Sequence, residues 1–207
     1  MGASTIPGEY LLPKLMGDFK KEHPHFILSL KIADTKEIVQ WVLQGDVEYG
    51  MIGGKLNHNV LHYEKYEEDE IIVVVPSGHP LTKKKKVDFV DLLEEPWIIR
   101  EEGSGTQMAV EKALRKKGKS LKQFNVVMEM GSTSSMKEGV KAGLGLAFIS
   151  KRAVREELNQ GLLSRIYVEG IDPISRQFYV VSHRGRTLSP IGMEFLRFLR
   201  RNRVEMI

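Results

Sequence analysis

Cysteine is absent from the 207 residues of this chain. Its absence excludes disulfide bonds, thiolate metal ligands and cysteine nucleophiles, and it fits a reducing cytoplasm without proving one. Long apolar runs are also lacking, because the longest is Ile71–Val75 and a membrane-spanning helix needs about 20 apolar residues. The first residues carry neither a basic region nor an apolar stretch. We therefore expect no signal peptide, no membrane contact and a cytoplasmic protein.

Recognisable catalytic and metal-binding patterns are missing as well. No serine lies in a Gly-x-Ser-x-Gly elbow, and the six histidines form no His-x-x-x-His pair on an expected helix. Gly103-Ser104-Gly105-Thr106 lacks the lysine of a phosphate-binding Walker A loop. Gly143-Leu144-Gly145 leads into a strand, which is the wrong order for a dinucleotide site. We expect a protein that is not an enzyme and holds no metal or cofactor.

The composition is that of a globular protein, with 42% hydrophobic and 28% charged residues. The net charge of +4 is modest, and the basic residues lie in separate runs such as Lys83–Lys86 and Arg115–Lys119. These runs contain no interleaved aromatic residues. A solvated surface therefore explains them better than a phosphate-contacting patch, although both readings stay open.

Apolar periodicity predicts strands that alternate with helices, and hence an α/β fold with parallel sheets covered on both faces. The stretch Pro76-Ser77-Gly78-His79-Pro80 interrupts this pattern and is the best candidate for a linker between two lobes. The expected strands are 2–5, 26–33, 49–53, 60–75, 97–100, 126–130, 144–149, 163–168 and 177–183. The expected helices are 8–22, one that Asp34 or Thr35 caps and that stops at Gly45, 89–93, 152–159, those opened by the loops 101–107 and 131–135, and a last one with Ser189 as N-cap and Pro190 at its first position.

One local pattern occurs twice between Trp97 and Ser135, where a short apolar strand ends in a loop of Gly, Ser and Thr that opens a helix. Such a loop directs free backbone N–H groups, hydroxyl donors and the positive end of the helix dipole to one place. It suits a small anion or polar ligand. Ser4-Thr5 and Asp34-Thr35 occupy the same position after earlier strands.

In open α/β sheets, ligands bind at the carboxyl ends of the strands. If the chain forms two lobes split near Pro76, two of these loops belong to each lobe and face each other across a cleft. Helix capping is the alternative role for the hydroxyls of 4–5, 35 and 132–134, and a tight turn is the alternative for Ser104 and Thr106. Arg100 could instead bind a ligand oxyanion or pair with Glu101 or Glu102. The candidate ligand-binding residues are Ser4, Thr5, Thr35, Arg100, Ser104, Thr106, Ser132, Thr133 and Ser134.

With these residues in place, the chain resembles the effector-binding domain of LysR-type transcriptional regulators over nearly its whole length. The pieces that carry the resemblance are weak singly but specific in their order and spacing. They include Gly2-Ala3-Ser4-Thr5, His23-Pro24, Val73-Val74-Val75-Pro76, His79-Pro80-Leu81, Pro96-Trp97-Ile98, Gly103-Ser104-Gly105-Thr106, Ala142-Gly143-Leu144-Gly145 and Ser189-Pro190. The sequences of residues 2–13 and 103–106 are similar to those of family members linked with sulfur, cysteine or selenium metabolism. Glu48-Tyr49 departs from the family, which commonly has Asp-Leu or Asp-Val there.

The resemblance implies two Rossmann-like subdomains with a central cleft, as in type 2 periplasmic binding proteins. Subdomain I would contain residues 1–75 and 176–207, and subdomain II residues 76–175. A small-molecule effector, an anionic or polar metabolite, would bind in the cleft and modulate DNA binding by the full-length regulator. The family's N-terminal winged helix-turn-helix is missing from this chain. We therefore expect the full-length regulator to contact DNA only through that missing domain.

The resemblance also implies a homodimer or homotetramer, in which the segments 11–22 and 26–33 pack beside the other lobe of a partner. Two rival functions use the same scaffold. One is a stand-alone solute-binding protein for a small anion, which predicts an export signal or a lipid anchor. The other is an enzyme such as a deaminase or dehydratase, which the missing cysteine and the missing acid–base groups disfavour.

Overall fold

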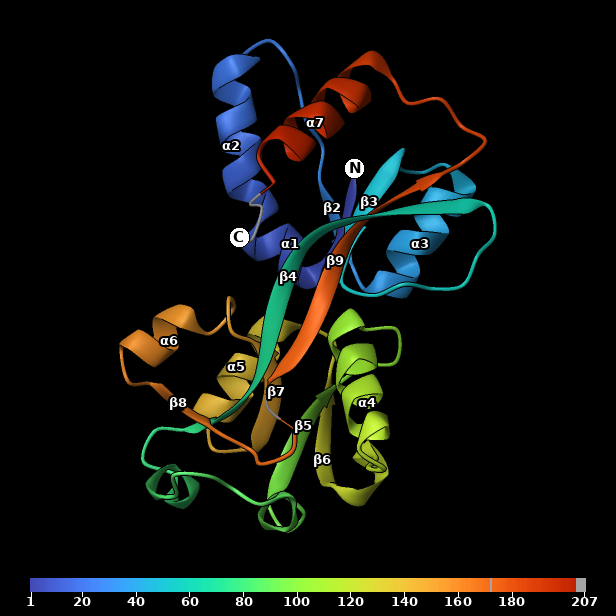
Figure 1. Ribbon diagram of the computed structural model, residues 1–207. Coiled ribbons are helices and arrows are strands. Elements are labelled where there is room, and N and C mark those ends of the chain that lie inside the picture. Colours follow the sequence, from blue (N-terminus) through green and yellow to red (C-terminus); the bar gives the residue numbers. More distant parts are fainter. Residues whose placement is uncertain (172, 204–207) are drawn as a thin grey trace. The chain divides into compact units, whose positions relative to one another are not determined.

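The computed structural model describes residues 1–171 and 173–203 and divides into two compact units (Figure 1). Unit 1 contains residues 1–68 and the chain from 177 onward, and unit 2 contains residues 69–176. The chain passes from one unit to the other between Glu68 and Asp69 and again between Arg176 and Gln177. The subdomain boundaries predicted from the sequence, after residues 75 and 175, stay a prediction.

Unit 1 is built on strands in the order β2-β1-β3-β9. Its β1 runs parallel to β2 and β3, whereas β9 pairs antiparallel with β3. The strands are β1 (Gly2–Ser4), β2 (Lys31–Ala33), β3 (Tyr49–Ile52), the first part of β4 (Leu61–Pro76) and most of β9 (Ile174–His183). The helices are α1 (Thr5–Tyr10), α2 (Leu12–Glu22), α3 (Thr35–Gln44) and α7 (Pro190–Arg201).

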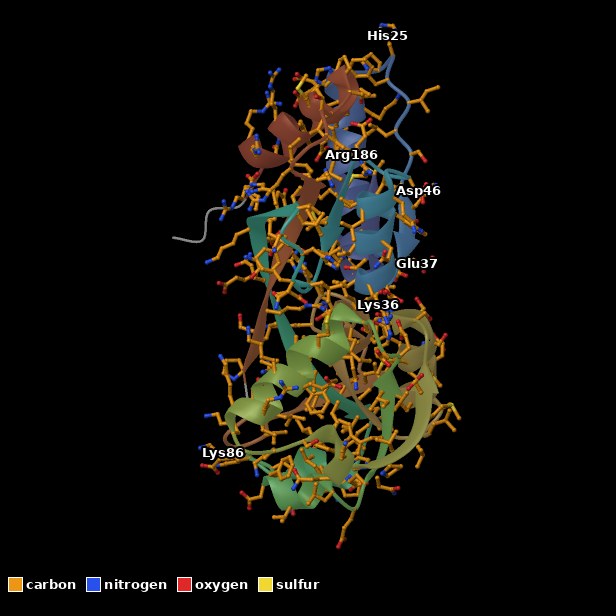
Figure 2. All side chains as sticks on the ribbon, turned by 90° about the vertical axis from the view of Figure 1, so that its right-hand side faces the viewer. His25, Lys36, Glu37, Asp46, Lys86 and Arg186 are labelled. Carbon is orange, nitrogen blue, oxygen red and sulfur yellow. The ribbon has the colours of Figure 1, made fainter. Side chains whose placement is uncertain are left out.

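Two clusters of buried side chains hold unit 1 together. In the first, α2 lies beside α7 (Figure 1), and the ring of Phe19 meets the rings of Phe195 and Phe198 edge-on at 5.0 and 5.3 Å between centroids. The second cluster packs α3 against the sheet through Ile38 and Val42. Arg186 closes the other end of α3, donating to the carbonyl oxygens of Val42 and Leu43 (Figure 2).

Two elements of unit 1 differ from the sequence prediction. The helix expected over 8–22 begins earlier, at Thr5, and breaks at Leu11, because Pro13 has no N–H and its ring clashes with the carbonyl four residues before it. The strand expected over 26–33 is only Lys31–Ala33. Within the described residues its strand partner is β1, which begins at Gly2, so no described strand lies beside the segment before Lys31.

Unit 2 has strands in the order β4-β7-β5-β6, with β8 also paired to β4. Its β5 runs parallel to β6 and β7, and β4 pairs antiparallel with β7 and β8. The strands are β5 (Pro96–Arg100), β6 (Asn125–Met130), β7 (Leu146–Ser150) and β8 (Leu163–Ile166). The helices are α4 (Gly105–Lys116), α5 (Thr133–Lys141) and α6 (Arg155–Asn159), with short 3-10 turns at Pro80–Lys83, Phe89–Leu92 and Leu121–Gln123.

The core of unit 2 is centred on Trp97. Its ring stacks on Phe148 at 4.7 Å and meets Phe124 edge-on at 4.8 Å, and its indole N–H donates to the Leu92 carbonyl at 2.8 Å. Trp97 is completely buried. Met128 is 41% exposed, because β6 is the last strand of the sheet.

The expectation of parallel sheets is only partly correct. Parallel pairs need a crossover connection such as a helix, and the pairs among β1, β2 and β3 and among β5, β6 and β7 have one. Strand β4 passes from unit 1 into unit 2, where it pairs antiparallel with β7. Strand β9 passes from unit 2 into unit 1, where it pairs antiparallel with β3. The fold class, α/β with strands followed by helices, is as predicted.

Candidate functional site

The first candidate residues of unit 1 lie where β1 ends and α1 begins. Ser4 is buried, with 5% of its surface exposed, and it stands at the N-cap position of α1. Its side chain makes no capping hydrogen bond, so capping does not account for the hydroxyl. Thr5 is the first residue of α1 and is half-buried. In register Ser4 pairs with Ala33, which brings this turn and the turn after β2 to one edge of the sheet.

Thr35 is the most informative residue of that edge. It is completely buried, and its Oγ1 has no hydrogen-bond partner within residues 1–171 and 173–203. Asp34, not Thr35, caps α3, because its Oδ1 accepts from the Glu37 N–H at 2.8 Å. Lys36 and Glu37 follow on the exposed side of the first turn (Figure 2). A buried hydroxyl without a partner is costly and requires an explanation such as a ligand or an ordered water.

The two hydroxyl-rich loops of unit 2 open α4 and α5 as the sequence predicts. Ser104 caps α4 by accepting from the Gln107 N–H at 3.4 Å, and Ser132 caps α5 by accepting from the Ser135 N–H at 3.0 Å. The capping alternative therefore holds for Ser132, and Ser104, for which a tight turn was the alternative, is a cap as well. Ser134 is exposed. The remaining candidate hydroxyls of these loops, Thr106 and Thr133, are buried.

Arg100 ends β5 and is buried, with 3% of its surface exposed. Its Nε and Nη2 donate to the two carboxylate oxygens of Glu101, each at 2.6 Å, so the expected alternative pairing with Glu101 is present. Its Nη1 donates to Thr133 Oγ1 at 3.1 Å, and Nη2 lies 3.4 Å from the Gly131 carbonyl oxygen. Arg100 thus joins the end of β5 to the start of α5.

A buried ionic cluster beside α4 was not found from the sequence. Arg176 Nε and Nη2 lie 2.8 and 2.7 Å from Asp69 Oδ2, and Arg176 Nη1 donates to Thr106 Oγ1 at 2.9 Å. Ser150 donates to the other oxygen of Asp69 at 2.8 Å, and Arg152 Nε lies 3.5 Å from it. Burial lowers the pKa of Arg176, while Asp69 opposes this shift and the neighbouring arginines add to it.

A signal for this cluster exists in the alternation of the strands. Asp69 has the same parity as Ile71 and Val73, and Arg176 the same parity as Ile174 and Phe178, so each continues a buried face of its strand. A charged residue in such a position must be paired.

Unit 1 also contains a hollow of about 160 Å³ away from the candidate residues. It lies at the beginning of β1 and β3, between Met16, Leu28 and Phe195, with Glu48 beside them. Glu48, the residue that departs from the family pattern, accepts from the Ser189 N–H at 2.9 Å and so lies at the start of α7. None of the predicted ligand-binding residues lines this hollow.

Within residues 1–171 and 173–203, no three His, Cys, Asp or Glu side chains are grouped so that they could hold a metal ion. In the same part of the chain, no helix combines the length and the apolar character that crossing a bilayer requires.

The family model described as LysR substrate binding domain matches residues 1–203. The chain belongs to this family. The HTH-type transcriptional activator CmpR of Synechocystis is 30% identical over 95% of this chain and 64% of its own length. A probable RuBisCO transcriptional regulator of Cyanophora paradoxa is 32% identical over 90% of this chain and 58% of its own length. The chain thus spans about 60% of the length of the curated relatives it matches.

Solved structures of this family share the fold. The Synechocystis CcmR regulatory domain, solved in complex with 2-PG, superposes with a TM-score of 0.88, at 25% identity and over 99% of this chain and 96% of that one. The effector-binding domain of QuiR in complex with shikimate has a TM-score of 0.85 at 19% identity, over 98% and 94% of the two chains. The fold is therefore that of LysR effector-binding domains, which is like that of type 2 periplasmic binding proteins.

These comparisons decide between the functions considered from the sequence. The relatives are named transcriptional regulators, so the alternative of a stand-alone solute-binding protein does not fit, and no enzyme name is among those of the relatives given above. The more specific prediction of a sulfur, cysteine or selenium subgroup stays a prediction.

Proposed function

We propose that this chain is the ligand-sensing domain of a LysR-type transcriptional regulator and that it binds a small anionic or polar metabolite. The residues of the proposed binding site lie where strands end and helices begin in each unit: Ser4, Thr5, Thr35, Arg100, Ser104, Thr106, Ser132, Thr133 and Ser134. In the full-length protein, occupancy would favour one arrangement of the subunits and so change DNA binding, as a population shift and not as chemistry. Binding in a cleft between subdomains 1–75 plus 176–207 and 76–175 stays part of this proposal.

The observation that carries the proposal is the family match over residues 1–203. The Synechocystis CcmR regulatory domain, which has the same fold over nearly all of its length, is solved in complex with 2-PG. The buried hydroxyl of Thr35, which has no hydrogen-bond partner among the residues that the structure describes, supports a ligand at the predicted place, because an unsatisfied buried donor costs about 1–3 kcal/mol.

Further properties of the whole regulator belong to the same proposal. We propose a homodimer or homotetramer in the cytoplasm that contacts DNA only through a winged helix-turn-helix outside this chain. Sedimentation velocity over a range of concentrations tests the assembly, and a strict monomer at the highest concentration would refute it.

Titration calorimetry of the purified chain with 2-PG, shikimate, sulfate and phosphate tests ligand binding. We expect one of these anions to bind, and we expect Thr35→Val and Ser132→Ala each to weaken it. The loss of one hydrogen bond to a charged ligand is worth about 1.5–3 kcal/mol, which is at least about tenfold in Kd. Thr187→Val is the matched control, because Thr187 is an exposed threonine of unit 1 outside the candidate site.

The result that would refute the site is a ligand that binds the parent and both site variants equally. The result that would refute the sensing role is a full-length regulator whose operator affinity, measured by mobility shift, is the same with and without the ligand that binds its isolated domain.

A further inference from the structure

Two buried threonines in unit 2 are each held by a buried arginine in the same way. At the start of α4, Thr106 Oγ1 accepts from Arg176 Nη1 at 2.9 Å. At the start of α5, Thr133 Oγ1 accepts from Arg100 Nη1 at 3.1 Å. All four side chains are buried. Within residues 1–171 and 173–203, neither threonine hydroxyl has a second hydrogen-bond partner.

Both arginines are fixed by a carboxylate on one edge of the guanidinium group. Arg176 places Nε and Nη2 on Asp69, whose second oxygen accepts from Ser150. Arg100 places Nε and Nη2 on Glu101. A planar guanidinium held on this edge cannot turn without breaking its contacts with the carboxylate, which are two hydrogen bonds for Arg100 and one hydrogen bond and one ionic contact for Arg176. In each case Nη1 is the group that donates to the threonine.

This arrangement sets the direction of the threonine hydroxyls. A hydroxyl has one proton to donate and two lone pairs, whereas a guanidinium has donors only. The arginine therefore occupies a lone pair of the threonine oxygen and leaves the proton for another acceptor. A ligand ammonium group would have to share the oxygen with a guanidinium, and like charges that close repel each other.

Resting on the function proposed above, we infer that Arg176 and Arg100 are positioning residues that turn Thr106 and Thr133 into hydrogen-bond donors. They thereby restrict this part of the site to oxyanions, such as the oxygens of a carboxylate, a sulfate or a phosphate. The arginines act through the threonines and not by contact with the ligand.

A mutant cycle on the purified chain tests this inference, with 2-PG and inorganic sulfate as probes in titration calorimetry. Thr106→Val removes the donor. Asp69→Asn/Arg176→Gln removes the pair that orients it without leaving a lone buried charge, and the triple variant combines both changes. Glu70→Gln/Arg165→Gln is the matched control, because that ion pair, 2.7 Å between Arg165 Nη2 and Glu70 Oε1, lies in unit 2 and contacts neither threonine.

We expect Thr106→Val and the Asp69/Arg176 variant each to weaken oxyanion binding on the order of tenfold. The triple variant should be no more than about twofold weaker than Thr106→Val, because residues that act in series are not additive. Thr106→Ser, which keeps the hydroxyl, should bind within about threefold of the parent. The control pair should bind like the parent.

Losses that multiply in the triple variant, to about a hundredfold, would overturn the inference, since Arg176 would then act independently of Thr106. A parent that binds ethylammonium as tightly as sulfate would overturn it as well. A parent that binds none of the oxyanions would instead refute the proposed function, so the two failures are distinguishable.

If the Asp69/Arg176 variant does not fold, as judged by thermal unfolding, the second arginine supplies an equivalent cycle. Glu101→Gln/Arg100→Gln is then combined with Thr133→Val, with the same expectation of non-additive losses.

Discussion

Replacing Thr35 by valine should make the ligand-free protein more stable and lower its affinity for the ligand. The side chain is fully buried and its hydroxyl has no partner in the part of the chain that the structure describes. Valine places a methyl group where the hydroxyl lies, so the substitution removes an unsatisfied polar group without leaving a cavity. The unmade hydrogen bond costs about 1–3 kcal/mol, and we expect Thr35→Val to recover at least about 1 kcal/mol of it. In a chain of this size that raises Tm by about 2–4 °C.

The same hydroxyl is expected to contact the ligand, so the two effects have opposite signs. A ligand at about 100 times its Kd stabilises the parent by about 2.7 kcal/mol. If Thr35→Val weakens binding tenfold, the same concentration stabilises the variant by only about 1.4 kcal/mol. Urea unfolding with and without 2-PG measures both quantities, and the slope with denaturant should be unchanged.

Thr133→Val is the matched comparison, because its hydroxyl is also buried but accepts from Arg100. That substitution removes a buried hydrogen bond to a charged group and should destabilise the protein by about 1.5–3 kcal/mol. A Thr35→Val variant that is destabilised as much as Thr133→Val would show that the Thr35 hydroxyl has a partner in the free protein. The Thr35 hydroxyl would then no longer support a ligand at this place.

Two further predictions concern single positions in unit 2. Gly145→Ala should destabilise the protein by several kcal/mol, since a Cβ there would lie 2.6 Å from the Pro96 carbonyl oxygen. Gly143→Ala should cost only about 1 kcal/mol, because nothing lies within 4 Å of a Cβ at that position. Equal midpoints of urea unfolding for the two variants would contradict this prediction. Burial, the largest single effect, raises the pKa of Glu157, but the bond from Lys137 (2.6 Å), a backbone hydrogen bond and the charges of Lys137 and Lys141 together outweigh it, so the folded-state pKa lies below the ordinary value of 4.5. The pair therefore stabilises the protein above pH 4.5 and loses this contribution as the pH falls through the folded-state pKa, and the difference in unfolding free energy between the parent and Glu157→Gln should shrink over that range; a difference independent of pH would refute the assignment.

Local signals in the sequence were sufficient where a helix start decides the structure. Ser189 caps α7 as predicted, and α4 and α5 begin in the two predicted loops, where Ser104 and Ser132 cap them. Helix capping involves residues within one helical turn, so it depends little on the tertiary structure around it. These local signals located three of the helix starts, including two that open onto candidate ligand-binding residues.

Features set by distant partners were predicted less well. The length of β2 depends on where β1 begins, which periodicity within 26–33 does not contain. The bond between Arg176 and Thr106 joins residues 70 positions apart, and the pair of Arg176 with Asp69 spans 107. Arg100 shows the limit well, because its neighbour Glu101 was foreseen and its bond to Thr133 was not.

The position of the two chain crossings has a consequence for how the protein is made. Unit 2 is one uninterrupted stretch, 69–176, whereas unit 1 needs β9 and the aromatic side chains of α7 from the end of the chain. On the ribosome, unit 2 can therefore complete its core while the earlier residues 1–68 still wait for their partners. Residues 1–68 leave the exit tunnel before unit 2 but are buried in a complete core only after unit 2 has folded. During that interval their exposed apolar side chains are where chaperones would act.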